Sequence, residues 1–219
     1  MWPGAHEPGR VGSVLMLCWR DVGHPQGGGS ETYLQRIGAQ LAADGVSVTM
    51  RTARYDGVHA APTIDARAGA VVRASGMALP FADDCVDICL SSNVAEHVPR
   101  PWQLGGEMLR VTRPGGLVVL SYTVWLGPFG GHEMGLMHYL GGARAAARYA
   151  RKHGRPAKNN YGSSLFAVSA ADGLDWAAST GALIAAFPRY HPKWAWWLTA
   201  APMVREFLVS NLVLVLQPQ

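Results

Sequence analysis

The segment from Met77 to Leu120 constrains the fold of this chain more than any other part. Its sequence, MALPFADDCVDICLSSNVAEHVPRPWQLGGEMLRVTRPGGLVVL, places a helical pattern between two short apolar runs. Pro114 and the two glycines that follow it stop the helix and turn the chain tightly. A helix that connects two buried strands is the crossover unit of a parallel sheet, so this segment predicts an α/β fold.

The alternation of apolar runs with helical patterns continues along the rest of the chain. Short apolar runs predict buried strands, and apolar residues three and four apart predict helices with one buried face. We therefore predict a Rossmann-like, mostly parallel sheet of about seven strands with helices on both faces. The predicted strands are 14–19, 46–52, 70–74, 86–90, 117–122, 182–190 and 207–216, and the predicted helices are 31–44, 101–112, 143–153 and 169–180.

Length and composition fit one such domain. The chain has 219 residues, of which 49% are hydrophobic and 16% charged, and an α/β domain of this size buries a substantial core. Residues 1–12 are rich in glycine and proline and predict a loose N-terminus ahead of a single domain over 13–219. Within that domain, 55–69 has no clear element pattern and separates 13–57 from 70–219.

Charge and cysteine usage exclude several classes of function. The net charge is only +4 and most basic residues are scattered, so no nucleic-acid partner is expected. Residues 144–158 are the exception, and they form either a solvated helix face or an anion site. The three cysteines lack the spacing of metal ligands, so we expect reduced thiols and no metal. Because no signal peptide and no apolar run of about 18 residues is found, we expect a cytoplasmic protein.

Polar and small residues follow the predicted strands where ligands bind in such sheets. Ligands of open parallel sheets lie beyond the carboxyl ends of the strands, where the strand order reverses. Ser75, Gly76 and Met77 follow the third predicted strand, and Asn93 follows the fourth. His97 comes shortly after Asn93 and is either a general base, since histidine titrates near neutral pH, or a residue whose ring caps or packs a helix start.

Short motifs occur in a fixed order between Arg73 and Tyr122. They are Leu79-Pro80-Phe81, Asp87, Glu96-His97-Val98, Glu107, Arg110-Val111 and Arg113-Pro114-Gly115-Gly116. Together they resemble class I S-adenosylmethionine (SAM)-dependent methyltransferases of the small-molecule kind called type 11. The resemblance implies that the cofactor is SAM, that a small molecule accepts the methyl group, and that the last strand is antiparallel.

The same resemblance gives roles to individual residues. It implies that Ser75 stands where the family has an acid that bonds the adenine, that Gly76 follows it, and that Met77 lies against the adenine face. It implies that Asn93 contacts the methionine part of SAM. For Glu107 and Arg110 we expect a structural ion pair or bonds that cap a strand, and Asp87, at the opposite end of the sheet, is also expected to be structural.

The first half of the chain departs from the methyltransferase pattern. The family has an acidic residue and a Gly-x-Gly-x-Gly loop after the first strand, whereas here three contiguous glycines abut a helix start. The region 13–57 resembles the opening βαβ unit of a retaining GT-B glycosyltransferase. If the loop still holds SAM, then Gly23, Gly27 and Gly28 are cofactor-binding candidates, and Asp56 is the candidate for the acid that binds the ribose.

Three interpretations follow from this departure. The chain is a methyltransferase with a divergent first loop, or a composite of a glycosyltransferase-like βαβ unit and a methyltransferase half, or a binding module without catalysis. The composite is structurally favoured, and it could have lost SAM binding. The function predicted from the motifs is still SAM-dependent methyl transfer, with a glycosyltransferase-like fragment as the alternative.

Three tryptophans cluster between the last two predicted strands. Trp194, Trp196 and Trp197 lie beside Lys193 and His191. Such a segment suits a membrane interface, where tryptophan rings sit at the level of the headgroups, and it equally suits the wall of a pocket or a packed core. We expect a lipid-like or glycolipid methyl acceptor and peripheral membrane contact through these tryptophans.

Overall fold

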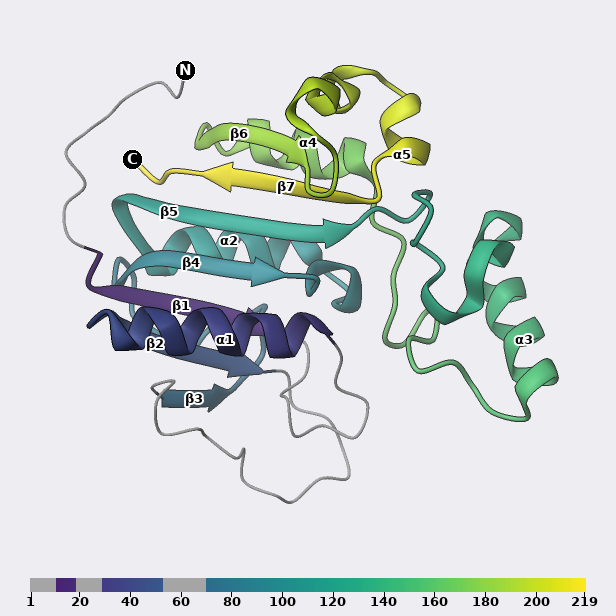
Figure 1. Ribbon diagram of the computed structural model, residues 1–219, viewed down its shortest axis with the longest axis horizontal. Helices are drawn as coiled ribbons and strands as arrows, with labels where there is room; N and C mark the ends of the chain where they lie inside the picture. Colours follow the sequence, from purple (N-terminus) through teal and green to yellow (C-terminus); the bar gives the residue numbers. More distant parts are fainter. Residues whose placement is uncertain (1–10, 19–28, 53–69) are drawn as a thin grey trace.

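The computed structural model describes residues 11–18, 29–52 and 70–219, which form an α/β domain around one seven-stranded sheet (Figure 1). The strand order is β3-β2-β1-β4-β5-β7-β6. The first five strands in this order are parallel, and β7 is antiparallel to both β5 and β6. The strands are β1 (Ser13–Cys18), β2 (Ser47–Thr52), β3 (Ala70–Arg73), β4 (Val86–Ser92), β5 (Thr112–Thr123), β6 (Leu183–Pro188) and β7 (Asn211–Leu216).

Helices cover both faces of the sheet, as the sequence predicts. Helix α1 (Gly29–Ala43) lies on one face (Figure 1). Helices α2 (Pro101–Val111) and α4 (Ala170–Ser179) share the other face, where Trp102 stacks on Trp176 with ring centroids 5.4 Å apart. The Rossmann-like fold, the strand number and the antiparallel last strand are therefore confirmed.

Strand β1 shows how the sheet is buried on both faces. Leu15 and Leu17 belong to the large core under α2 and α4, whereas Val14 and Met16 belong to a smaller core under α1. Successive side chains of a strand point to opposite faces, so a continuous apolar run is what a doubly covered strand requires.

Two segments of the sheet differ from the sequence prediction. Strand β7 begins at Asn211 because Val204–Leu208 forms a short helix, α5, so Phe207 and Leu208 are not strand residues. The predicted turn at 113–116 is an excursion inside β5: Thr112 pairs with Val86, and the pairing resumes at Leu117 with Ile88.

A separate layer lies beyond the carboxyl ends of the central strands (Figure 1). It contains the 3-10 segment η2 (His132–Leu140) and helix α3 (Gly142–His153). Its own small core consists of Met134, Ala145, Ala157 and Leu165. Among the described helices, none is long and apolar enough to span a bilayer.

Asp87 holds the opposite end of the sheet together. Its carboxylate accepts hydrogen bonds from the backbone of Gly12 (2.6 Å) and Ser13 (2.7 Å) and pairs with Arg113 (2.6 Å). Burial would raise the pKa of Asp87, but these hydrogen bonds and the charge of Arg113 outweigh it and lower the pKa below its usual value. Asp87 thus has the structural role that the sequence predicts.

Asp87→Asn should lower the free energy of unfolding by about 1–3 kcal/mol at pH 7, since it removes a charged acceptor from several donors. The folded-state pKa of Asp87 lies below the unfolded value of about 3.9. The carboxylate therefore contributes fully to the free energy of unfolding above the unfolded pKa, and this contribution is lost as the pH falls through the folded pKa. Urea unfolding at several pH values should therefore show a smaller acid-induced loss for the variant. An equal loss in both proteins would contradict this role.

Two adjacent glycines of α2 offer a matched test of helix packing. A Cβ on Gly105 would lie 2.3 Å from Cη2 of Trp176, whereas a Cβ on Gly106 would meet nothing within 4 Å. Gly105→Ala should therefore destabilise the protein by about 1–3 kcal/mol through overpacking. Gly106→Ala should be neutral or stabilise it by up to about 1 kcal/mol, because alanine favours a helix interior. Thermal unfolding of both variants measures the difference, and similar values would contradict the packing of α2 on α4.

Candidate active site

A junction of polar side chains joins the ends of three strands at the ligand-binding edge. Thr123, the last residue of β5, accepts hydrogen bonds at Oγ1 from Asn93 Nδ2 (3.1 Å) and Asn211 Nδ2 (3.2 Å). Asn93 follows β4 and has a φ of +55°, in the left-handed region that asparagine tolerates better than most residues. The local turn and these two amides fix the side chain of Asn93 at the rim.

Arg189 brings a positive charge to this junction. It follows β6, and its Nη1 donates hydrogen bonds to Ser92 Oγ (2.8 Å) and Asn93 Oδ1 (3.2 Å). Its guanidinium lies 5.6 Å from the ring centre of Tyr33 and 5.4 Å from that of Tyr190. Among the described carboxylates, none is recorded within ion-pair distance of Arg189. An anionic ligand group at the rim would find a fixed cation here.

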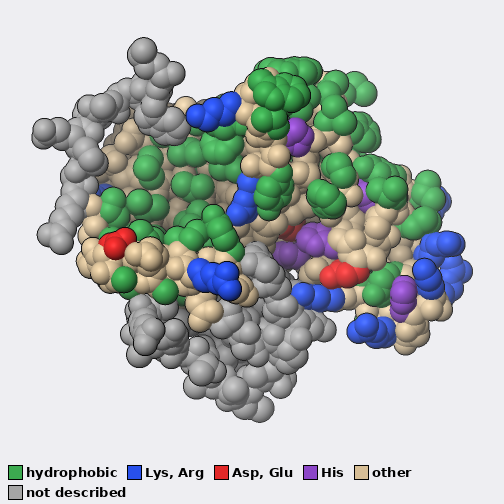
Figure 2. All heavy atoms as spheres, in the orientation of Figure 1, with side chains coloured by type: hydrophobic (Ala, Val, Ile, Leu, Met, Phe, Trp, Pro, Cys, Tyr) green, Lys and Arg blue, Asp and Glu red, His purple; other side chains and the backbone are tan. Residues whose placement is uncertain are grey.

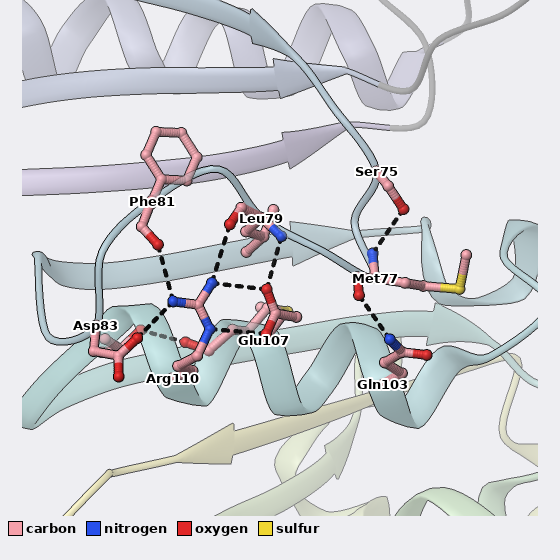
Figure 3. A network of polar contacts seen from close by, with 10 residues as sticks. Ser75, Met77, Leu79, Phe81, Asp83, Gln103, Glu107 and Arg110 are labelled. Atoms are coloured by element: carbon pink, nitrogen blue, oxygen red, sulfur yellow. Dashed lines mark hydrogen bonds and ion pairs between the residues drawn. The ribbon is translucent and has the colours of Figure 1, made fainter.

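The loop after β3 forms the other end of the candidate site. The Ser75 hydroxyl accepts a hydrogen bond from the backbone of Met77 (3.2 Å), and Gln103 Nε2 donates to the Met77 carbonyl (2.8 Å). Gly76 is buried in the same turn. Figure 3 shows that the Met77 side chain points away from the polar network that anchors the rest of the loop. The thioether is thus placed to contact a ligand beyond β3.

That network is the structural pair that the sequence predicts. Arg110 contacts both carboxylate oxygens of Glu107 (2.8 and 2.7 Å) and donates to the carbonyl oxygens of Leu79 (3.0 Å) and Phe81 (2.9 Å) (Figure 3). The hydrogen bonds from Arg110 lower the pKa of Glu107. The backbone of the Leu-Pro-Phe motif is therefore hydrogen-bonded to α2, which gives the motif a structural role.

The two ends of the candidate site lie on strands that are not neighbours. Strands β3 and β4 are separated by β2 and β1, so their ends are roughly 14 Å apart at ~4.8 Å per strand spacing. Strands β2 and β1, which lie between them, end at the same edge of the sheet. The predicted cofactor residues Gly23, Gly27, Gly28 and Asp56 lie outside the described residues.

A group of one carboxylate and two imidazoles, in which Glu96 and His97 are buried and His132 is half-buried, lies next to Asn93. Glu96 and His97 belong to the short 3-10 segment η1 (Ala95–His97), and His132 begins η2. Each of the three side chains offers one ligand atom, and these atoms lie within 4.8 Å of one another. Figure 2 shows histidine side chains gathered beside a hollow on this face, with acidic and basic groups close by.

Backbone contacts fix Glu96 and His97, the two members of this group that belong to η1. Glu96 Oε1 accepts a hydrogen bond from the Thr123 backbone N–H (3.2 Å), and His97 Nδ1 lies 2.6 Å from the carbonyl oxygen of Ser164. Complete burial raises the pKa of Glu96 to about 7, although hydrogen bonding from Thr123 opposes the shift. His97 is buried and its ring is held, as in the packing interpretation. A carbonyl can only accept, so Nδ1 carries the proton and Nε2 the lone pair.

The tryptophan cluster divides between exposed and half-buried side chains. Trp194 and Trp197 lie on the 3-10 segment η3 (Lys193–Ala200) and are 79% and 60% exposed. Trp196 instead stacks on Phe187 with ring centroids 4.4 Å apart. Trp125 packs against Tyr161 in the core of the η2–α3 layer.

Sequence reasoning missed Glu96, His132 and Arg189 as site residues. Glu96 was part of a motif, but nothing in its spacing indicated complete burial. Arg189 and His132 are 96 and 39 positions from Asn93 (189 − 93 and 132 − 93), and only the fold brings such distant residues together. Arg189 lies near the carboxyl end of the sixth predicted strand (182–190), and a basic residue at that end was the available signal for it.

Comparison with known proteins places the chain in a family. A model of the methyltransferase domain matches residues 21–120. An uncharacterized methyltransferase of Mycobacterium tuberculosis is 83% identical over 219 residues, an alignment that covers the whole chain and 82% of the relative. A counterpart in Mycobacterium avium is 71% identical over 227 residues and is also covered to 82%.

Solved structures agree at the level of the fold. A SAM-dependent methyltransferase from Methanosarcina mazei superposes with a TM-score of 0.53 at 14% identity, covering 96% of this chain and 94% of that one. A geranyl diphosphate methyltransferase in complex with GPP and sinefungin gives a TM-score of 0.52 at 11% identity, covering 97% and 74%. The chain belongs to the class I SAM-dependent methyltransferases. The likeness of 13–57 to glycosyltransferases stays a prediction.

Proposed function

We propose that this protein transfers the methyl group of SAM to a small, lipid-like acceptor that it meets at a membrane surface. The observation that carries the proposal is the arrangement at the edge of the sheet between Met77 and Asn93. The apolar side chain of Met77 lies at one end of the candidate site, and the hydrogen-bonded side chains of Asn93 and Arg189 lie at the other. A site of this length suits an extended nucleoside ligand that lies across the ends of β3, β2, β1 and β4.

The described residues fit the two ends of SAM. Met77 offers an adaptable apolar surface for the adenine, and Ser75 and Gly76 offer a hydroxyl and backbone groups in place of an acid. Asn93 and Arg189 offer an amide and a guanidinium for the amino-acid end, whose carboxylate matches the charge of Arg189. When bound, SAM supplies an electrophilic methyl group on a sulfonium. The protein's part is to align that group with the acceptor and to exclude water.

The apolar nature of the acceptor is inferred from a surface on the same side of the molecule. We define the apolar surface as nine large hydrophobic residues, each at least 40% exposed, of which eight belong to η2, η3 and α5 and one, Met203, directly precedes α5. A contact between Tyr139 and Phe207, with ring centroids 6.3 Å apart, links η2 to α5, and Figure 2 shows the hydrophobic side chains gathered there. The nine are Leu136, Tyr139, Leu140, Trp194, Trp197, Met203, Val204, Phe207 and Leu208.

Basic residues flank the apolar surface. Helix α3, which packs beside η2, exposes Arg144, Arg148, Arg151 and Lys152 and contains no acidic residue. Apolar side chains bounded by lysine and arginine are the combination that binds an anionic lipid surface. Because η2 also carries His132, a lipid-like acceptor that leaves the bilayer here would arrive next to the candidate site.

Arg189→Gln should weaken SAM binding by about 10- to 100-fold, the loss that accompanies removal of a charged hydrogen bond. Lys193→Gln removes the same charge from an exposed position nearby and should leave the affinity unchanged. Calorimetric titration with SAM, its demethylated product and a nucleotide sugar measures the effect. Unchanged affinity in Arg189→Gln would contradict the assigned role. No binding of SAM by the parent chain would favour a chain that has lost the cofactor, and binding of the nucleotide sugar alone would favour a glycosyltransferase.

Replacing Trp194 and Trp197 together by serine should reduce binding to vesicles of phosphatidylglycerol and phosphatidylcholine by at least about tenfold, since two exposed aromatic anchors are lost. Ile184→Ser, at a 45% exposed position on β6 outside the apolar surface, is the control and should bind like the parent. Flotation measures the bound fraction. The membrane part of the proposal fails if the parent does not float with the vesicles, or if the control and the double variant lose binding equally.

A further inference from the structure

The group formed by Glu96, His97 and His132 has the composition of a metal site. Two imidazoles and one carboxylate are ligands that suit Zn²⁺ and neighbouring divalent transition metals. We propose that these three side chains bind one divalent transition-metal ion, with zinc as the best-suited member of the class. Three protein ligands from the described part of the chain converge on the ion, and a zinc ion with three protein ligands has a fourth position for a further ligand.

The imidazole of His97 is oriented as in known metal sites. Its Nδ1 lies 2.6 Å from the backbone carbonyl oxygen of Ser164, so this nitrogen carries the proton and Nε2 presents its lone pair. Metal-binding histidines commonly donate their other N–H to a carbonyl or carboxylate, which fixes the tautomer and the ring.

Glu96 adds a buried carboxylate with one oxygen to spare. Its Oε1 accepts the Thr123 N–H, whereas Oε2 has no hydrogen bond of regular geometry within the described part of the chain. A buried carboxylate with an unsatisfied oxygen is costly, and a cation beside it would offset that cost. Glu96 and His97 are adjacent residues of the short, buried segment η1. Their side chains nevertheless place one ligand atom each in the same group.

His132 completes the group from a different part of the fold. It has a φ of +47°, so the backbone adopts the left-handed conformation at the start of η2. Its Nδ1 lies 3.4 Å from Asn159 Nδ2, which also donates to Glu133 Oε1 at 3.0 Å. An amide nitrogen can only donate, so Nδ1 is the acceptor here and an ion that binds at Nε2 would displace the proton of that nitrogen. The rings of His132 and His97 have centroids 5.4 Å apart. The strained backbone and the held side chain together place the imidazole over η1.

The spacing allows coordination after a small movement. Bonds of about 2.0–2.2 Å place two ligands of a tetrahedral ion about 3.4 Å apart, and the three atoms here lie within 4.8 Å of one another. Binding would therefore draw the side chains together by up to about 1.4 Å, the difference between these two separations, which ring and carboxylate rotations can provide. The sequence indicated no metal site because the cysteines lack metal spacing and His132 is far from Glu96 in the chain.

The position of the site indicates what the open coordination position would take. Glu96 shares Thr123 with Asn93, which we place at the amino-acid end of SAM, next to the sulfonium that carries the methyl group. An acceptor with an oxygen or thiol group would thus bind the ion close to the transferable methyl. This use of the ion rests on the proposed function, whereas the binding of the ion does not.

The test is a titration of the full chain, first dialysed against a chelator, with Zn²⁺ by calorimetry and with Co²⁺ by visible absorption, without SAM. We expect one ion per chain and a Co²⁺ spectrum typical of nitrogen and oxygen ligands. Glu96→Gln keeps the size and the Thr123 contact but removes the charge, and His132→Ala removes an imidazole. Each should weaken binding at least about tenfold. His153→Ala, an exposed histidine on α3, should not change it.

The outcomes separate this site from the proposed function. Saturable binding that both cluster variants lose, with thermal unfolding showing that they still fold, supports the metal site even if SAM does not bind. No saturable binding by the parent, parent-like affinity in Glu96→Gln and His132→Ala, or an equal loss in His153→Ala would overturn it. Because the Co²⁺ spectrum is read on the parent chain, the proposal stays testable if a variant fails to fold.

Discussion

The hydroxyl of Thr123 is the interaction on which the candidate site depends. It accepts amide hydrogens from Asn93 and Asn211, so one oxygen joins the end of β4, the end of β5 and the start of β7. The backbone N–H of the same residue holds Glu96. Two atoms of a single residue thus hold Asn93, at the proposed cofactor site, and Glu96, in the proposed metal site. A small displacement of β5 would therefore move both residues.

The two sides of the candidate site are held by different contacts. On the side of β3, the loop over Leu79 and Phe81 is fixed to α2 by Arg110, which binds the carbonyl oxygens of both residues. On the side of η2, the layer packs around its own small core, against which Trp125 lies. The side next to β3 is therefore held by hydrogen bonds from one arginine, and the side next to η2 is held by apolar packing.

Local patterns predicted the fold well but predicted the site only in part. Strand β1 was recognisable because burial on both faces demands a continuous apolar run, and α4 because Ser169 caps it as expected. Phe207 and Leu208 were misassigned to a strand because short apolar runs do not distinguish helix from strand. The pairing of Arg189 with Asn93 depends on the sheet order, which no local pattern contains.

The antiparallel direction of β7 has a consequence for handling the molecule. Its amino end, Asn211, lies at the site, so its carboxyl end emerges at the far edge of the sheet, where Gly115 N donates to the carbonyl of Pro218 at 2.8 Å. Figure 1 shows this terminus on the side away from η2 and α3. A fluorophore or surface tether attached after Gln219 would leave the ligand-binding edge facing solution, which suits immobilised assays of both small molecules and vesicles.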